Sequence, residues 1–152
     1  MKIAIVANSS WAAYNFRLNL AQNIVREGFE VIFIIPFDGK YSEKLQENYV
    51  CHNLAIDAKG LNPFKELKTL YSLFSFYRNE KPGIVCHFTI KLNIYGSIAA
   101  WLCNIPSIAN ITGLGTAFLN NNIFTLLAKF LYKFALLFPS KIFFQNNEDL
   151  SY

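Results

Sequence analysis

Acidic residues are missing from a long part of this chain of 152 residues. Residues 82–147 contain no Asp or Glu, whereas Lys91, Lys129, Lys133 and Lys141 all lie there. The second half of the chain is therefore basic, within an overall net charge of +4. An uncompensated positive surface favours an anionic partner, such as a diphosphate, a nucleotide or an acidic membrane.

The chain also lacks the segments that mark membrane-spanning or exported proteins. Its longest apolar stretch, residues 123–138, is interrupted by two lysines and is shorter than the roughly 20 residues that span a bilayer. The apolar run at residues 3–7 is shorter than expected for an export signal and is followed by no cleavage site, and the three cysteines form no Cys-x-x-Cys pair. Cys86 and His87 are predicted to point to opposite faces of a strand, so they make a poor metal pair, and we expect no metal site. These features predict a cytoplasmic protein with buried, unpaired cysteines.

Charged residues are scarce overall, at 16% against 53% hydrophobic residues, which excludes a disordered or low-complexity chain. The length fits one domain with a single core. Several short runs are apolar without alternation, which is typical of strands that are buried on both faces of a parallel sheet. These runs are residues 3–7, 31–35, 84–88, 107–111 and 141–144, with a weaker strand at 50–56.

Helical segments separate these strands. Residues 15–27 place Phe16, Leu20 and Ile24 on one apolar stripe, which we expect to face the core. A second helix is expected from Pro63 to about residue 79, and Asn93 is a candidate cap for a third helix that ends near residue 104. The alternation predicts an α/β, Rossmann-like three-layer domain with a mainly parallel, doubly wound sheet. Its ligand crevice is expected at the carboxyl ends of the strands.

The loop after the first strand, residues 8–14, contains no glycine. Dinucleotide and Walker-type phosphate loops need glycine for close backbone approach, so this loop argues against both, despite Asp38 after the second strand. Arg17 at the start of the first helix has two interpretations. It either clamps a phosphate or carboxylate or is a solvated surface arginine.

Two later loops also follow strands. The first offers His87 and Lys91, a possible proton carrier and a possible phosphate partner, although a histidine at a strand end is often a buried structural residue. The second contains Gly113 and Gly115, whose backbone amides are suited either to a ligand or simply to a tight turn.

Several longer motifs carry a family resemblance: residues 2–17, 62–63, 87–96, 111–118 and 143–146. Together they resemble the N-terminal domain of GT-B glycosyltransferases of family 4, in the bacterial branch that extends lipid-linked oligosaccharides for O-antigen, capsule or protein glycans. Leu92 departs from the proline usual in this branch. Thr112 replaces a histidine that contacts the donor sugar in many family members, so that role is not carried over.

The resemblance implies a retaining sugar transfer from a nucleotide diphosphate sugar, usually a UDP-sugar, to an undecaprenyl-diphosphate-linked saccharide. It implies a peripheral location at the inner face of the cell membrane, with neither a cofactor nor a nucleic-acid partner. Acceptor contacts are expected from the residues that follow the strands, with His87 as the catalytic candidate. The expected contacts are Asn15, Arg17, Lys91 and Asn93, with Thr112, Gly113 and Gly115 as the opposite wall.

In this family the nucleotide-sugar site lies in a second Rossmann domain. We therefore expect residues 1–152 to be a single acceptor domain without the donor-binding domain, and to transfer no sugar alone. Two alternatives stay open. One is a non-catalytic, membrane-recruiting subunit of a split glycosyltransferase, and the other is a stand-alone nucleotide-binding Rossmann domain.

The apolar segment 123–138 contains Lys129 and Lys133 on one narrow polar stripe. It is predicted to be either a helix buried against the sheet and a missing neighbour domain or a helix in the membrane interface. In the second case the lysines reach lipid phosphates while residues such as Phe130 and Phe134 enter the acyl boundary.

Overall fold

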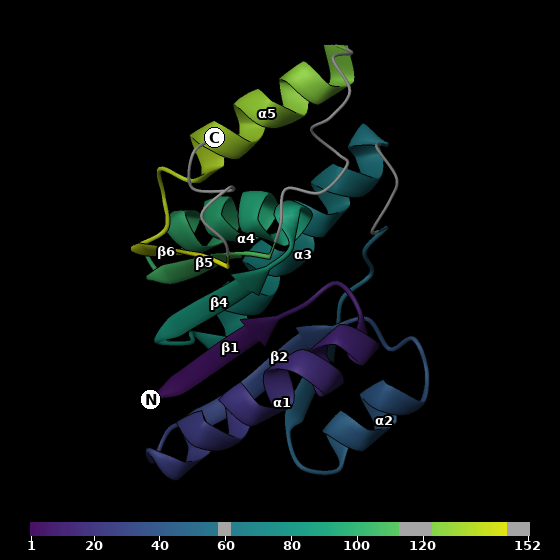
Figure 1. The fold of residues 1–152 in the computed structure, drawn as a ribbon, viewed down its shortest axis with the longest axis vertical. Coiled ribbons are helices and arrows are strands. Elements are labelled where there is room, and N and C mark those ends of the chain that lie inside the picture. Colours follow the sequence, from purple (N-terminus) through teal and green to yellow (C-terminus); the bar gives the residue numbers. More distant parts are fainter. Residues whose placement is uncertain (58–61, 113–122, 146–152) are drawn as a thin grey trace.

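The computed structural model describes residues 1–57, 62–112 and 123–145, and these form one six-stranded sheet with helices packed against it (Figure 1). All neighbouring strands are parallel, in the order β3-β2-β1-β4-β5-β6, so the predicted doubly wound α/β fold is confirmed. In chain order the elements are β1 (Lys2–Val6), α1 (Ser10–Arg26), β2 (Glu30–Ile35), α2 (Lys40–Gln46), β3 (Val50–Asn53), α3 (Pro63–Glu80), β4 (Ile84–Phe88), α4 (Ile90–Leu102), β5 (Ser107–Ile111), α5 (Ile123–Ala135) and β6 (Lys141–Phe144).

The central strands supply two separate cores because successive side chains point to opposite faces of a sheet. Ile5 of β1 packs in a cluster that includes Ala21 of α1. The next residue, Val6, packs in a second cluster with Leu73 of α3 and Leu92 of α4. Helices α1 and α2 therefore cover one face of the sheet, and α3 and α4 cover the other. This explains why the strands read as continuous apolar runs.

Helix α5 joins the α4 side through a third, smaller cluster. Tyr132 and Ala135 are buried there against Ile94 of α4 and Ile111 of β5. One face of α5 is thus attached to the domain, and Figure 1 shows the helix at the β6 end of the sheet. Among the described residues, no helix combines the length and the apolar character needed to cross a bilayer.

The helix boundaries follow from local capping. The Ser9 hydroxyl accepts a hydrogen bond from the Ala12 N–H at 3.1 Å and so begins α1. The Asn62 side chain does the same for the Phe64 N–H at 3.0 Å, and Pro63 occupies the first helical position, where the helix was predicted to begin.

Two predictions about α1 were wrong. The helix begins at Ser10 rather than Asn15, because Ser9 provides the cap. Phe16 and Leu20 were expected in the core, but 57% and 40% of their surface is exposed. The buried face instead includes Ala13 and Ala21, whose small side chains let the helix lie close to the sheet.

Other boundaries also differ from the predictions. Helix α2 was not predicted, because a helix of seven residues with only Ser42 and Leu45 buried has too little periodicity to be recognised. Asn93 does not cap α4, which begins at Ile90 after Thr89. Strand β3 and helix α5 end at Asn53 and Ala135, earlier than expected.

His87 of β4 links three elements of the α3–α4 core. Its side chain is fully buried, and its Nε2 forms a 2.8 Å hydrogen bond with the Tyr77 hydroxyl of α3. Gly96 of α4 lies against the same imidazole, so closely that a Cβ at this position would overlap the ring. The absence of a side chain at Gly96 therefore allows α4 to pack on β4.

We expect Gly96→Ala to destabilise the domain. Helix propensity alone predicts a gain of roughly 0.5–1 kcal/mol for this change. The overlap with His87 should outweigh it, because overpacking a core costs about 1–3 kcal/mol. Urea unfolding measures whether the free energy of unfolding rises or falls. The same substitution in a His87→Ala background should be far less harmful, and equal effects in the two backgrounds would show that the imidazole is not the obstacle.

Candidate functional site: a cleft at the carboxyl ends of the strands

A cleft of about 390 Å³ lies where β1, β4, β5 and β6 end. Its position matches the crevice expected for a doubly wound sheet. None of its described lining residues is acidic, and most of the polar ones offer an amide or a hydroxyl. The lining residues are Ala7, Asn8, Ala12, Phe16, Arg17, Phe88, Thr89, Thr112 and Gln145.

Arg17 supplies the positive charge of this cleft. Its guanidinium carbon lies 4.0 Å from the centre of the Phe88 ring, a cation–π contact that fixes the side chain over the end of β4. Partial burial lowers the pKa of Arg17, but a guanidinium stays charged at any physiological pH. Within the described residues Arg17 has no acidic partner. An anionic ligand is the natural partner for such a group.

The N-terminus of α1, by contrast, already has an internal anion beside it. Asp38 accepts hydrogen bonds from the Ser10 hydroxyl and from the Ser10 N–H, the latter at 3.2 Å. A carboxylate here satisfies the helix end and repels a second anion. Asp38 thus holds the start of α1 to the segment that follows β2. This arrangement argues against a dinucleotide site at the first loop, as its lack of glycine also did.

Thr89 lies in the cleft with an unusual backbone. Its φ and ψ are 79° and 154°, a conformation that a β-branched residue adopts only under constraint. Strain of this kind costs on the order of 1–3 kcal/mol and is concentrated at functional sites. Thr89 also makes no side-chain capping bond to α4.

Of the predicted contact residues that the structure describes, Arg17 and Thr112 alone lie together in this cleft. Asn15 is exposed on α1, and its side-chain amide donates to the Trp11 carbonyl at 2.8 Å. Asn93 is buried and donates to the Asn110 carbonyl at 2.9 Å, so it ties α4 to β5. Gly113 and Gly115 lie outside the described residues.

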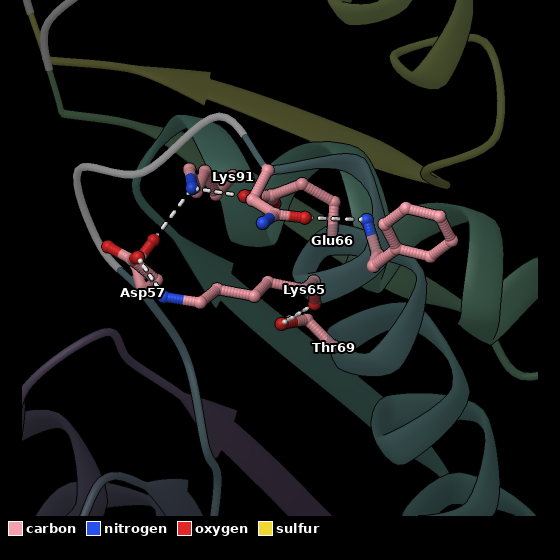
Figure 2. A network of polar contacts seen from close by, with 7 residues as sticks. Asp57, Lys65, Glu66, Thr69 and Lys91 are labelled. Atoms are coloured by element: carbon pink, nitrogen blue, oxygen red, sulfur yellow. Dashed lines mark hydrogen bonds and ion pairs between the residues drawn. The ribbon is translucent and has the colours of Figure 1, made fainter.

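Lys91 points away from the cleft toward α3. Figure 2 shows its Nζ between Glu66 Oε1, at 2.5 Å, and the Asp57 carbonyl, at 2.6 Å. Lys91 and Glu66 are mostly covered, with 16% and 13% of their side chains exposed. Burial and the charge of Glu66 raise the pKa of the nearby Tyr95 to about 12. Lys91 therefore has an internal partner, which fixes the start of α4 to α3 and to the segment before it.

The position of His87 does not fit the catalytic role suggested for it. Burial lowers its pKa to about 3, so the ring is neutral at physiological pH. Because the side chain is fully buried, it has no contact with the cleft or with solvent. A general acid or base must reach the proton that it transfers. The alternative of a buried structural histidine fits the observed contacts.

Asn8, Thr89 and Gln145 line the cleft but were not selected from the sequence. The sequence marks them as candidates only by position, since each follows the end of a strand immediately or after one intervening residue. Small polar residues are common at such positions, so this signal does not distinguish a ligand contact from a turn residue.

The fold and the cleft together define a Rossmann-like domain with a positively charged crevice. Residues 2–146 match the Glycosyl transferase 4-like family model, and the chain belongs to this family.

Two relatives add detail about this family. The chain is 25% identical to an N,N'-diacetylbacillosaminyl-diphospho-undecaprenol alpha-1,3-N-acetylgalactosaminyltransferase of Campylobacter jejuni, over all of this chain and 42% of that protein. It is also 25% identical to a UDP-Gal:alpha-D-GlcNAc-diphosphoundecaprenol alpha-1,3-galactosyltransferase of Escherichia coli, over 81% of this chain and 32% of that protein. The chain thus spans less than half the length of both relatives.

Among solved structures, MurG of Acinetobacter baumannii has the same fold over 93% of this chain and 40% of its own. The TM-score is 0.64, and the two sequences are 16% identical.

We expect the burial of His87 to make the domain sensitive to acid. The native state holds the imidazole neutral down to a pKa of about 3, whereas the unfolded chain protonates it near pH 6.5. The contribution of the neutral His87 to stability is therefore fully present above pH 6.5. As the pH falls below 6.5 this contribution is lost, and the folding equilibrium constant decreases by up to tenfold per pH unit. Chemical unfolding between pH 7 and pH 4 measures this slope. Because carboxylates also titrate, the comparison is with His87→Asn, and parallel curves would contradict the explanation.

Proposed function

We propose that this chain is the acceptor-binding half of a retaining glycosyltransferase. The reaction moves a sugar from a nucleotide diphosphate sugar, most simply a UDP-sugar, to an undecaprenyl-diphosphate-linked saccharide in surface polysaccharide or glycan biosynthesis. The choice of substrates follows the two relatives, whose names specify diphospho-undecaprenol acceptors and, for one, UDP-Gal.

The observation that supports this function best is the cleft around Arg17. It combines a half-buried guanidinium with side-chain amides and hydroxyls, and none of its described lining residues is acidic. These groups suit the diphosphate of a lipid-linked acceptor, because charge-assisted bonds to phosphate oxygens are among the strongest available to a protein. Sugar hydroxyls match the remaining amide and hydroxyl groups.

The donor site is proposed to lie in the part of the longer relatives that this chain does not match. In this proposal the cleft forms one wall of an active site between two domains. The 152-residue chain is then expected to bind acceptor but to transfer no sugar without the second wall.

The proposal also includes contact with an anionic membrane through α5. The face opposite the buried Tyr132 exposes Phe130 and Phe134, at 67% and 47%. Lys133 is exposed beside them and Lys129 is half-buried. An apolar helix face with basic residues is the usual chemistry of a helix that lies in the membrane interface. One face of α5 is attached to α4 and β5, which leaves the exposed face available to a membrane surface.

Replacing Arg17 should impair use of the acceptor. In an assay that includes the donor-binding domain, whether on the same chain or on a partner chain, we expect Arg17→Ala to reduce kcat/KM for a diphosphate-linked acceptor. The expected loss is roughly 1.5–3 kcal/mol, the contribution of a hydrogen bond to a charged group. Arg17→Lys should recover part of this loss, because it keeps the charge but not the planar fork.

Arg26→Ala on the same helix is the matched control, since Arg26 is exposed and donates a hydrogen bond to the Asn23 side chain one turn earlier. Equal kinetics for Arg17→Ala and Arg26→Ala would mean that Arg17 is a surface arginine. If the chain binds acceptor and anionic vesicles but transfers no sugar even together with a donor-binding domain, it is better described as a non-catalytic, membrane-recruiting subunit.

Charge reversal on α5 should weaken membrane binding. Each lysine near an anionic surface contributes about 1 kcal/mol. We therefore expect Lys129→Glu plus Lys133→Glu to lower partition onto anionic vesicles at least roughly 30-fold at low salt. Co-sedimentation with anionic and neutral liposomes, at low and high salt, measures the effect.

Lys40→Glu plus Lys44→Glu is the control for net charge, because these lysines lie on α2, which covers the other face of the sheet. An equal loss in both double variants would show that overall charge, and not α5, governs binding. If binding ignores lipid charge, salt and both substitutions, α5 is not the membrane contact.

A further inference from the structure

An apolar groove runs along the outer face of α3, the helix that covers the opposite face of the sheet from α1. It has a volume of about 700 Å³, within the roughly 300–1,000 Å³ of small-molecule sites. Four large apolar residues that line it are exposed: Phe64 at 82%, Leu67 at 64%, Tyr71 at 70% and Leu102 at 50%. Apolar surface gathered in this way marks an interaction site rather than ordinary scatter. We call it the α3 groove.

The α3 groove begins at the same edge of the sheet as the cleft. Phe64 lies in the first turn of α3, and Glu66 in that turn reaches Lys91, which follows the end of β4 (Figure 2). From there the groove follows α3 to Phe74, where it meets the end of α4. The Cys103 thiol next to Leu102 donates to the Phe74 carbonyl at 3.7 Å, which places the two helices in contact there.

The charges around the α3 groove are suited to an anionic amphiphile. Lys68 is its only charged lining residue within the described part of the chain. The two acids of α3 are each paired with a cation, Glu66 with Lys91 and Glu80 with Lys2. Neither is more than 24% exposed.

The lining also offers few hydrogen-bond partners. Apart from Lys68, Tyr71 is the only described lining residue with a polar side-chain group. An extended peptide laid in this groove would leave backbone groups unpaired, which is costly. A hydrocarbon chain has no such groups, and each buried methylene improves affinity roughly fourfold.

We propose that the α3 groove binds the isoprenoid chain of a polyprenyl-diphosphate-linked acceptor. The proposal rests on the function proposed above and extends it from the head of the acceptor to its tail. The diphosphate lies at the edge of the sheet where the strands end. The chain then follows α3 from Phe64 toward Leu102, with Lys68 beside it.

The test uses the 152-residue chain with two soluble probes, farnesyl diphosphate below its micelle concentration and inorganic diphosphate. Titration calorimetry should give at least tenfold tighter binding for farnesyl diphosphate. Leu67→Asp should abolish this advantage and leave inorganic diphosphate unchanged. Phe64→Asp should act likewise, and an acid in the first turn of a helix is well tolerated, so it guards against a folding defect.

Leu126→Asp on α5 is the matched control, because Leu126 is 68% exposed, close to the 64% of Leu67. It should leave both probes unaffected. Equal binding of the two probes, or the same loss in Leu126→Asp, would overturn the proposal. The proposal would also be overturned if the chain formed a dimer that Leu67→Asp converted to a monomer without changing probe binding. The groove would then be an interface between copies of the chain.

The two proposals can fail separately. If farnesyl diphosphate binds in a Leu67-dependent way but the chain transfers no sugar even together with a donor-binding domain, the groove stands and the proposed reaction falls. The opposite outcome is sugar transfer, in the presence of a donor-binding domain, with the same KM for long-chain and short-chain acceptors. If Leu67→Asp also leaves both KM values unchanged, only the groove is refuted.

Discussion

The parallel pairing of all six strands is the constraint on which the rest of this structure depends. Because every strand runs in the same direction, the segments after β1, β4, β5 and β6 meet at one edge of the sheet. The cleft is built at that edge from residues far apart in the sequence, among them Arg17 and Gln145. The same pairing buries both faces of the central strands, so each helix must fit a rigid apolar surface.

Burial decides which polar groups at this edge are available to a ligand. His87, Lys91 and Asn93 all lie near the end of β4, yet each is turned inward and bonded to another element. A buried polar group without a partner is costly, so these residues serve the packing of α3, α4 and β5 first. Arg17 differs because an aromatic ring and not a carboxylate holds it. Its charge stays uncompensated within the described residues, which suits the binding of an anion.

The domain combines a polar cleft with exposed apolar surfaces. On the α1 side, Asp38 occupies the helix start, and the cleft opens beside α1. On the α3–α5 side, α3 and α5 both expose large apolar residues accompanied by lysines. A domain that handles an amphipathic molecule needs both properties, one for the polar head and one for the hydrocarbon. Their placement on one rigid sheet is consistent with an acceptor that is anchored in a membrane.

The sequence by itself determined the fold class, the order of the long elements and the basic character of the second half, because hydrophobic periodicity and charge are local properties of the chain. Its motifs also indicated the family. Tertiary structure decided which residues at the strand ends are free to act. Arg17 and Lys91 are both basic residues that follow a strand in the sequence. In the structure, Lys91 forms an ion pair with Glu66 of α3, whereas Arg17 lies over the ring of Phe88. The exposure of Phe16 and the burial of His87 likewise depend on how closely helices pack on the sheet, and that distance is set by residues elsewhere in the chain, such as Ala21 and Gly96.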